Sequence, residues 1–266
     1  MPQEEWILDG PKVIDVELVR KLKVSLIAGQ VDIVGHDEPG ARVEVHSVSG
    51  RDLKISIDGD TLEIDHPQLR WDNFIDVFAS FNGKARAEVS IMVPREVALK
   101  FGVVSSSALI SGLISDASIS TVSGDIVVDG VTGDINLNAV SGEIAVRNHR
   151  GAVRAHTVSG DITVTGEISK YLSEGVSGDV FLDITGQPAE IRVNTVSGAL
   201  TTRLTAGQPA EYRINTVSGR LQLDDSAISG VRGSFTGKYG TLDASALELR
   251  VNTVSGNISV LHAVSA

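Results

Sequence analysis

Short runs of alternating apolar and polar residues recur along the chain, and most of them follow the phrase Val-Ser-Gly. After the copy at 122–124, Ile126 and Val128 fall on one face of an extended strand, and Ile144 and Val146 repeat them one copy later. A run of four or five such residues is too short for a helix. The pattern therefore predicts many short β-strands separated by corners.

These corners recur at an almost fixed spacing. Intact phrases end at Gly124, Gly142, Gly160 and Gly178, which are 18 residues apart, and the spacing then lengthens to 20 and 21 at Gly198 and Gly219. A fixed period is typical of stacked repeats rather than of one globular core. We therefore predict an all-β fold, a single-stranded β-solenoid or β-helix of short strands with about 18–21 residues per coil. A two-sheet sandwich with tight hairpins ranks second, because it would not require turns at one fixed period and so does not explain the observed spacing.

The glycine that ends each phrase is expected to lie at a corner that requires a positive φ angle, as in a type II turn. By the same strand parity, Val122 should face the interior four residues before Ile126. The structural turn glycines predicted in this way are Gly50, Gly124, Gly142, Gly160, Gly178, Gly198, Gly219 and Gly256.

The repeat pattern also suggests how the chain is organised. We expect residues 1–100 to be a β-rich entry section continuous with the solenoid, and residues 101–266 to be the regular repeat solenoid, in one structural domain overall. A duplication relates 186–198 to 207–219, and a third partial copy spans 248–256. Residues 220–246 break the register, either as one irregular coil or as an insertion.

Two regions are candidate interaction surfaces. Residues 67–83 are rich in aromatic side chains, which could form a hydrophobic plug, the favoured interpretation, or an exposed partner site. They are Trp71, Phe74, Phe78 and Phe81. The strand 257–261 should be the last, and an open solenoid end invites another strand. Ile258 and Val260 would then contact a second copy or a partner strand, unless residues 220–246 or the aromatic segment cover that end.

Charge and composition exclude several classes of partner. The formal net charge of −11 does not favour nucleic acid or anionic lipid. The absence of cysteine excludes disulfides and thiolate metal sites. The chain has no run of 18 apolar residues and its first 20 residues are acidic, so we expect a cytoplasmic protein without direct membrane insertion. Association with the cell envelope stays open.

Polar residues at repeat-equivalent positions are expected to be structural. The turn acids Asp125, Glu143, Asp161 and Asp179 should stack along one corner. They could bind Ca²⁺, but the calcium-binding turn GGxGxD is missing, so bonds from backbone N–H groups are favoured. We expect cross-strand Glu–Arg pairs from 190–192 and 211–213, with hydrogen-bond ladders at the Asn-Thr corners.

Catalytic motifs are not found in the sequence. The six histidines show neither HxH nor HExxH spacing, and there is no GxSxG elbow or phosphate loop. A polysaccharide lyase or hydrolase would need paired carboxylates in a groove. We therefore predict no enzymatic activity, no cofactor and no metal.

The repeated TVSGDI-like turns, together with the section LIAGQVDIVG at 26–35, resemble the bacterial β-strand-repeat family labelled "putative adhesin", a domain of unknown function. The resemblance covers nearly the whole chain, in which Val-Ser-Gly occurs eight times. It implies a solenoid without an assigned enzymatic activity, often linked to the envelope. We expect an acidic, non-catalytic scaffold or protein-interaction module that binds an unknown protein partner or associates with itself through a solenoid end. An envelope carbohydrate-binding or adhesive protein is the alternative, and a polysaccharide-active enzyme is less favoured.

Overall fold

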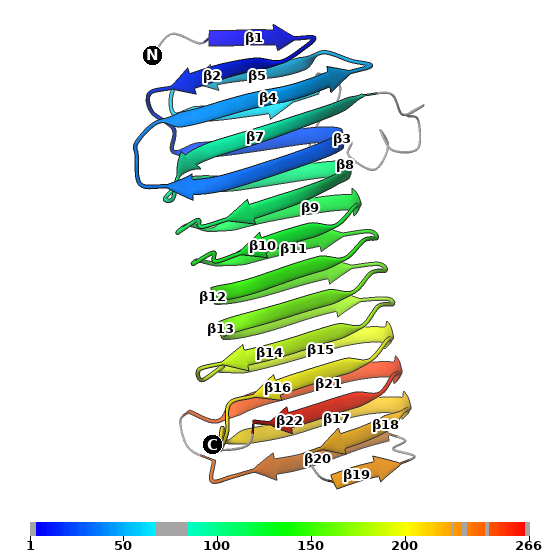
Figure 1. Cartoon of the computed structure of the whole chain (residues 1–266). Helices are drawn as coiled ribbons and strands as arrows, with labels where there is room; N and C mark the ends of the chain where they lie inside the picture. The colour runs from blue at the N-terminus through cyan, green and yellow to red at the C-terminus, as the bar shows by residue number, and fades with distance from the viewer. Residues whose placement is uncertain (1–3, 67–84, 225, 230–232, 243–244, 264–266) are drawn as a thin grey trace. The chain divides into compact units, whose positions relative to one another are not determined.

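The computed structural model describes residues 4–66, 85–224, 226–229, 233–242 and 245–263, and every helix or strand among them is a β-strand (Figure 1). Backbone contacts divide the chain into two compact units, residues 1–136 and 137–266. The sequence-based division at residue 100 stays a prediction. The aromatic candidates Trp71, Phe74, Phe78 and Phe81 lie outside the described residues.

Unit 1 is built from long parallel strands with shorter antiparallel strands added at its N-terminal side. Its strands are β1 (Glu4–Leu8), β2 (Lys12–Val16), β3 (Lys21–His36), β4 (Ala41–Ser49), β5 (Leu53–Asp58), β6 (Thr61–Asp65), β7 (Arg86–Pro94), β8 (Ala98–Ser111), β9 (Ala117–Ser123) and β10 (Ile126–Asp129). The next strand, β11 (Ile135–Ala139), crosses the boundary between the units in the sequence.

The parallel strands of unit 1 do not follow one another in sequence order. β3 pairs in parallel with β8, and its other edge pairs in parallel with β6 and β7. β8 continues to β9 and β10, also in parallel. The antiparallel pairs β1–β5, β5–β6, β2–β4 and β4–β7 complete the unit. Alternate residues such as Leu22 and Val24 are fully buried, as the alternating pattern requires.

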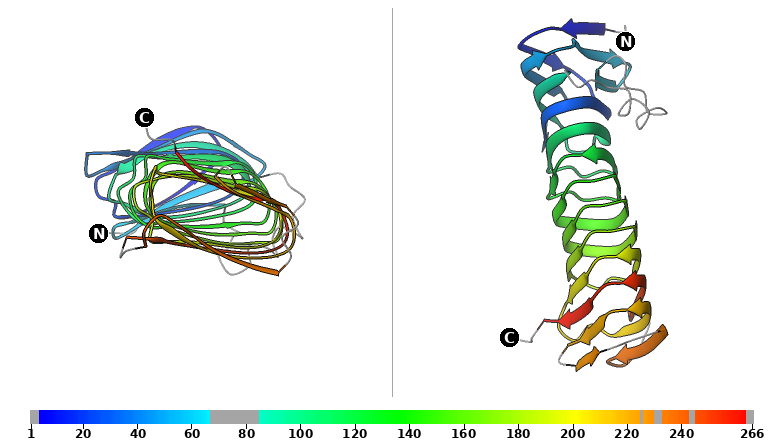
Figure 2. Two further views of the ribbon diagram at one scale, coloured as in Figure 1. Left: turned by 90° about the horizontal axis from the view of Figure 1, so that it is seen from below. Right: turned by 90° about the vertical axis from the view of Figure 1, so that its right-hand side faces the viewer.

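Unit 2 is more regular, and the coils of each unit appear as flattened loops in Figure 2. Its strands are β12 (Ile144–Thr157), β13 (Ile162–Gly175), β14 (Val180–Thr185), β15 (Glu190–Ser197), β16 (Leu200–Leu204), β17 (Ala210–Ser218), β18 (Arg220–Leu223), β19 (Ser226–Ser229), β20 (Gly233–Tyr239), β21 (Leu247–Ser255) and β22 (Ile258–His262).

Parallel pairing at the predicted spacing joins the first coils of unit 2. Ile144 of β12 lies opposite Ile162 of β13, which in turn lies opposite Val180 of β14. β13 and β14 then pair in parallel with β15 and β16. Consecutive coils therefore stack in register rather than forming hairpins, and the all-β, solenoid-like fold is confirmed.

The last coil departs from this order. β21 pairs in parallel with both β15 and β17, and β22 pairs in parallel with both β16 and β18 (Figure 1). Residues 247–262, here called the C-terminal coil, thus lie between two coils that precede them in sequence. The prediction that Ile258 and Val260 form an open end is wrong, because β22 is paired on both edges and the two residues are 2% and 0% exposed.

Residues 220–246 supply the outermost strands of unit 2 instead. β18 belongs to the coil that contains β17, whereas β19 and β20 run antiparallel to β18 and β17 and lie on their outer side. The segment is therefore not one irregular coil, and its described part after β18 is an insertion that forms two antiparallel strands. It covers the coil that would otherwise end the parallel stack.

A column of close backbone contacts explains the phrase glycines. A Cβ atom on Gly160 would lie 2.1 Å from the carbonyl oxygen of Gly142, and a Cβ on Gly256 would lie 2.0 Å from that of Gly198. φ is positive at six of the eight phrase glycines but not at Gly219 or Gly256. Glycine is therefore needed at these stacked corners because one coil approaches the next too closely for a Cβ atom. This adds to the turn conformation that the sequence predicts.

Candidate interaction face on unit 2

Most residues of the repeated phrase have a structural role inside the fold. Thr157 Oγ1 donates to the Ser159 carbonyl at 3.3 Å within its own corner, and Ser159 Oγ donates to the Val140 carbonyl of the preceding coil at 3.3 Å. The acid that follows the phrase links coils as well, because the Asp179 N–H donates to Asp161 Oδ1 at 2.8 Å. The predicted role of the turn acids as acceptors of backbone N–H groups is therefore confirmed at Asp161.

The valine of the phrase is the exception, because it points to solvent. Six such side chains on unit 2, here called the valine row, are between 37% and 63% exposed. They are Val140, Val158, Val176, Val196, Val254 and Val217, given in the order in which their coils stack. The prediction that the phrase valine faces inward holds for Val122 of unit 1, which is buried, and is wrong for the valine row.

The bend in the corner explains this reversal. In β21 the inward alternation runs through Val251 to Thr253, which leaves Val254 outside. The next buried residue is Ile258, an odd number of positions after Thr253. Parity is lost because Gly256 and Asn257, between β21 and β22, do not continue as an extended strand, and the alternation rule applies only to extended residues.

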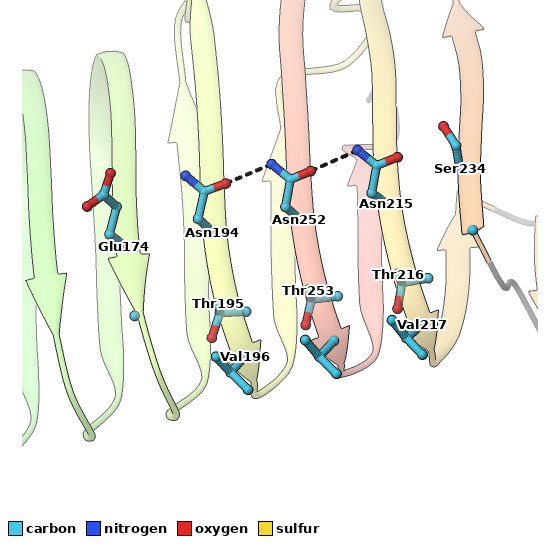
Figure 3. Close-up of a pocket in the computed structure, with 13 residues that line it drawn as sticks. Glu174, Asn194, Thr195, Val196, Asn215, Thr216, Val217, Ser234, Asn252 and Thr253 are labelled. Atoms are coloured by element: carbon cyan, nitrogen blue, oxygen red, sulfur yellow. Dashed lines mark hydrogen bonds between the residues drawn. The ribbon is translucent and has the colours of Figure 1, made fainter.

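Beside the valine row, three strands present matching rows of polar side chains. Asn252 of β21 lies opposite Asn194 of β15 and Asn215 of β17. Asn252 Nδ2 donates to Asn194 Oδ1 at 2.7 Å, and Asn215 Nδ2 donates to Asn252 Oδ1 at 2.8 Å (Figure 3). The predicted ladder at the Asn-Thr corners is thus formed by the Asn side chains. The Thr hydroxyls bond within their own corners instead.

The Glu and Arg rows pair along the strands more than across them. The in-register pairing sets Glu248 opposite Glu190 and Glu211, so like charges are neighbours. Arg250 pairs with Glu248, and Arg213 pairs with Glu211 at 3.4 Å, both within one strand. The contact of Arg213 with Glu248, at 3.5 Å, does cross between strands. The expected cross-strand ladder is therefore mainly a set of pairs along each strand.

Glu190 has a further partner on the coil before it. Lys170 Nζ lies 2.7 Å from Glu190 Oε2. This hydrogen bond, together with the charge of Arg192, holds the pKa of Glu190 below its usual value despite partial burial. Glu190 is therefore held in its ionised form as a structural partner of two cations.

An open groove of about 690 Å³ lies over this part of unit 2 (Figure 3). It is lined by the three ladder asparagines, by Val196, Val217 and Val254, and by neighbouring residues that include Glu174 and Ser234. We call it the Asn–Val groove. A row of amides beside a row of methyl groups, repeated at the strand spacing of roughly 4.8 Å, suits an extended chain that both hydrogen-bonds and buries apolar surface.

The sequence candidates and this groove do not coincide. Ile258 and Val260 are core residues, and the four aromatic candidates fall outside the described part of the chain. The valines of the groove were missed, although the triple occurrence of Asn-Thr-Val-Ser-Gly was visible as a signal. In the described residues no group of three or more His, Asp or Glu side chains is placed to hold a metal ion.

A family model described as Toastrack DUF4097 matches residues 19–261. The chain belongs to this family. The resemblance to the "putative adhesin" domain of unknown function is thereby confirmed. No curated protein matches this Toastrack chain.

Three solved structures are similar to the Toastrack chain. A putative lipid binding protein from Parabacteroides distasonis is 14% identical, covers 93% of this chain and 99% of its own, and has a TM-score of 0.51. A putative cell adhesion protein from Clostridium sporogenes is 14% identical over 98% and 100% of the two chains, with a TM-score of 0.31. A putative adhesin from Bacteroides fragilis is 11% identical over 94% and 97%, with a TM-score of 0.33. The first of these likenesses shows the fold alone.

The described strands and connections include no helix with the length and apolarity that crossing a membrane requires.

Proposed function

We propose that the chain is a non-catalytic, single-stranded β-solenoid scaffold that binds another protein along the valine row of unit 2. The observation that carries this proposal is the contrast within the repeated phrase. Threonine, serine, glycine and acid make contacts within the coil or with an adjacent coil, whereas Val158, Val176 and Val196 stand 48–51% exposed in solvent.

An aligned row of exposed apolar side chains is a feature of binding surfaces. Soluble proteins rarely leave contiguous apolar patches in water unless a partner covers them. Here the row is continued by the Asn–Val groove, whose amides offer hydrogen bonds next to the methyl groups. A partner segment in extended conformation would bury the valines and bond to the amides.

The use of the carboxylates supports a non-catalytic role. Asp161 and Asp179 accept backbone N–H groups of the following coils at 2.8 and 2.7 Å. Glu190 and Glu248 are engaged by Lys170 and by arginines of their own strands. These acids stabilise the stack and are committed to neighbouring groups, whereas a general acid or base must be free to exchange a proton with substrate.

Site-specific photo-crosslinking in cells that make the chain tests the binding surface. A photoreactive residue at Val176 or Val196 is expected to give discrete covalent adducts with another protein, and the same residue at Thr201, a partly exposed position outside the row, is not. Adducts of equal yield from Thr201, or none from the two valine positions, would contradict the proposal.

A triple variant then separates binding from folding. Thr has nearly the shape of Val, so Val158→Thr, Val176→Thr and Val196→Thr should each change stability by less than about 0.5 kcal/mol at these exposed positions. The crosslinked partner, once purified, should bind the triple variant at least tenfold more weakly than the unmodified chain. Equal affinity would remove the valine row from the interface.

A carbohydrate-binding, adhesive protein is the second candidate, and the Asn ladder favours it because side-chain amides bond well to sugar hydroxyls. A glycan array distinguishes the two candidates, since a carbohydrate ligand should lose affinity with Asn252→Ala and keep it in the valine triple variant. We also propose association with the cell envelope, as the family resemblance implies. Fractionation of cells that make the chain at native level should then place it with washed membranes.

A further inference from the structure

The C-terminal coil occupies a place that two earlier coils form around it. On one side, the Leu200 N–H donates to the Asn257 carbonyl at 2.9 Å. On the other side, the Gly256 N–H donates to the Ser218 carbonyl at 3.3 Å, and the Asp224 N–H donates to the Val260 carbonyl at 2.8 Å. The coil therefore hydrogen-bonds to a strand edge of each neighbour. The backbone N–H and C=O groups of those edges are unpaired whenever the coil is absent.

Its two neighbours carry nearly the same sequence as the coil itself. Glu-x-Arg-x-Asn-Thr-Val-Ser-Gly occurs at 190–198, 211–219 and 248–256. The two inward residues between the Glu and the Asn are buried hydrophobic residues in all three copies, and the pairs Asn194–Asn252 and Asn215–Asn252 have the same register. β17 therefore carries the same pattern of side chains as β21 and could pair with the edge of β15 in the same register. A coil of this sequence fits the place regardless of which chain supplies it.

Side chains of the neighbouring coil fasten both ends of the C-terminal coil. At its start, Gln208 Nε2 donates to the Ser245 carbonyl at 2.9 Å, and the Leu247 N–H donates to the Pro209 carbonyl at 2.8 Å. At its end, the His262 ring lies between Asp224 and the Gln208 carbonyl and stacks on Tyr239 at 3.6 Å. We call Gln208, Asp224, Tyr239 and His262 the His262 cluster. All of its contacts could be remade with an incoming coil.

We propose that this place also accepts the C-terminal coil of a second copy of the chain, which yields an exchanged dimer. During folding, coils 186–204 and 207–223 precede the C-terminal coil in the chain, and the place between them stays open until a coil inserts. When two copies fold together, the C-terminal coil of each can therefore enter the open place of the other. Exchange of identical elements creates few new contacts, so its cost is low once the coil is out.

Cysteine chemistry detects this exchange cleanly, because the chain has no cysteine of its own. One protein carries Asn194→Cys and a second carries Asn252→Cys. The two positions are register partners on neighbouring parallel strands, a spacing that a disulfide can bridge. The two proteins are unfolded, mixed, refolded and oxidised. Exchange predicts a covalent heterodimer, because position 252 of one chain then lies beside position 194 of the other.

A matched pair controls for random collisions. Glu174 and Asn194 are also register partners on neighbouring parallel strands, but exchange of the C-terminal coil leaves both in the same chain. A mixture of Glu174→Cys and Asn194→Cys proteins should thus give at least tenfold less heterodimer. Equal yields from the two mixtures would overturn the proposal.

Light scattering on the unmodified chain provides a second measurement that needs no disulfide. After refolding at high concentration, exchange predicts a dimer that persists on dilution and reverts to monomer only after unfolding. A synthetic peptide of residues 246–262, present during refolding, should reduce the dimer by occupying the open places. A chain that refolds as a monomer at every concentration would also overturn the proposal.

Discussion

His262 and Asp224 form a hydrogen-bonded pair that joins β22 to the coil beside it. His262 Nδ1 lies 3.0 Å from Asp224 Oδ2, and the His262 N–H donates to Asp224 Oδ1 at 2.6 Å. The second ring nitrogen faces the Gln208 carbonyl at 3.1 Å, and the His side chain is 3% exposed. Both ring nitrogens thus lie within hydrogen-bond distance of oxygen atoms, and the ring links Asp224 to the Gln208 carbonyl.

Loss of this pair should loosen the C-terminal coil selectively. His262→Leu removes the ring hydrogen bonds and leaves the partly buried Asp224 without this hydrogen-bond partner, at a cost of about 2–3 kcal/mol. The expected result is roughly 30- to 150-fold faster amide hydrogen exchange across residues 247–262, with β12 and β13 unchanged. Asp224→Asn is the matched control, because Asn tolerates the φ of +49° at this position and isolates the loss of charge. Unchanged exchange in both variants would show that the pair does not hold the coil.

A methyl group in the glycine column should be far more damaging than one at an open corner. Gly160→Ala sets a Cβ 2.1 Å from the Gly142 carbonyl oxygen, with φ at +121°, so the coils must separate at a cost of about 3 kcal/mol or more. Gly207 also has a positive φ, at +73°, but a Cβ added there would have no atom within 4 Å. Gly207→Ala should therefore cost only the backbone penalty of about 1 kcal/mol. Urea denaturation followed by circular dichroism compares them. Equal losses of stability would mean that the stack can yield at Gly160.

Acid should destabilise unit 1 through His66. Its ring is fully buried and Nδ1 accepts the Ile27 N–H at 3.2 Å. Burial first, and then the charge of Arg51, lower the pKa of His66 to about 4. Because the folded state prefers the neutral ring, this stability is complete above pH 6.5 and is lost as pH falls through 4, up to about 3 kcal/mol. The advantage of the unmodified chain over His66→Asn, which keeps an acceptor, should shrink accordingly between pH 7 and pH 4.

Asp65, one residue earlier, should respond in the opposite direction. Burial, and then the charge of Glu63, raise the pKa of Asp65 to about 6, so the folded state prefers the protonated acid. Stability from this group is therefore present below pH 4 and is lost as pH rises through 6. Asp65→Asn should stabilise the chain at pH 7.5, by about 1–2 kcal/mol because the half-buried group is partly screened, and should be neutral at pH 4. A pH-independent effect would contradict this assignment.

The Asn ladder should behave as a chain of coupled bonds. Asn252→Ala breaks two side-chain hydrogen bonds, whereas Asn194→Ala and Asn215→Ala break one each. At these exposed positions each bond contributes about 0.5–1 kcal/mol, so Asn252→Ala should be the costliest single change. Adding Asn194→Ala to Asn252→Ala should cost little more, since their shared bond is already gone. Strictly additive losses in urea denaturation would exclude a ladder.

The repeat period and the alternating pattern were sufficient to predict the strands, the parallel stacking and the tight corners. Val-Ser-Gly at a fixed spacing leaves few other arrangements, and the close approach at Gly160 is a direct consequence of that stacking. The Asn ladder could also be predicted, because Asn194 and Asn215 occupy equivalent places in two copies. The strands, the corners and the ladder depend only on local sequence and on the regular shift from one coil to the next.

The order of the last coils could not be predicted, because the sequence is nearly degenerate there. β21 matches β15 and β17 equally well, so local pairing preferences do not decide which strand lies in the middle. The outward direction of Val196 was missed for a different reason. The alternation rule was carried through a corner at Gly198 and Ala199, which lie between β15 and β16 and are not part of a strand.

The position of the C-terminal coil has a mechanical consequence. A force that pulls on residue 263 is carried by β22, which is bonded to β16 on one edge and to β18 on the other. Extracting it must therefore break two ladders together, whereas an outermost strand such as β19, bonded to β18, can peel away from one. A tether attached at this end of the chain is thus anchored inside the stack, and the load is shared by the coils on either side.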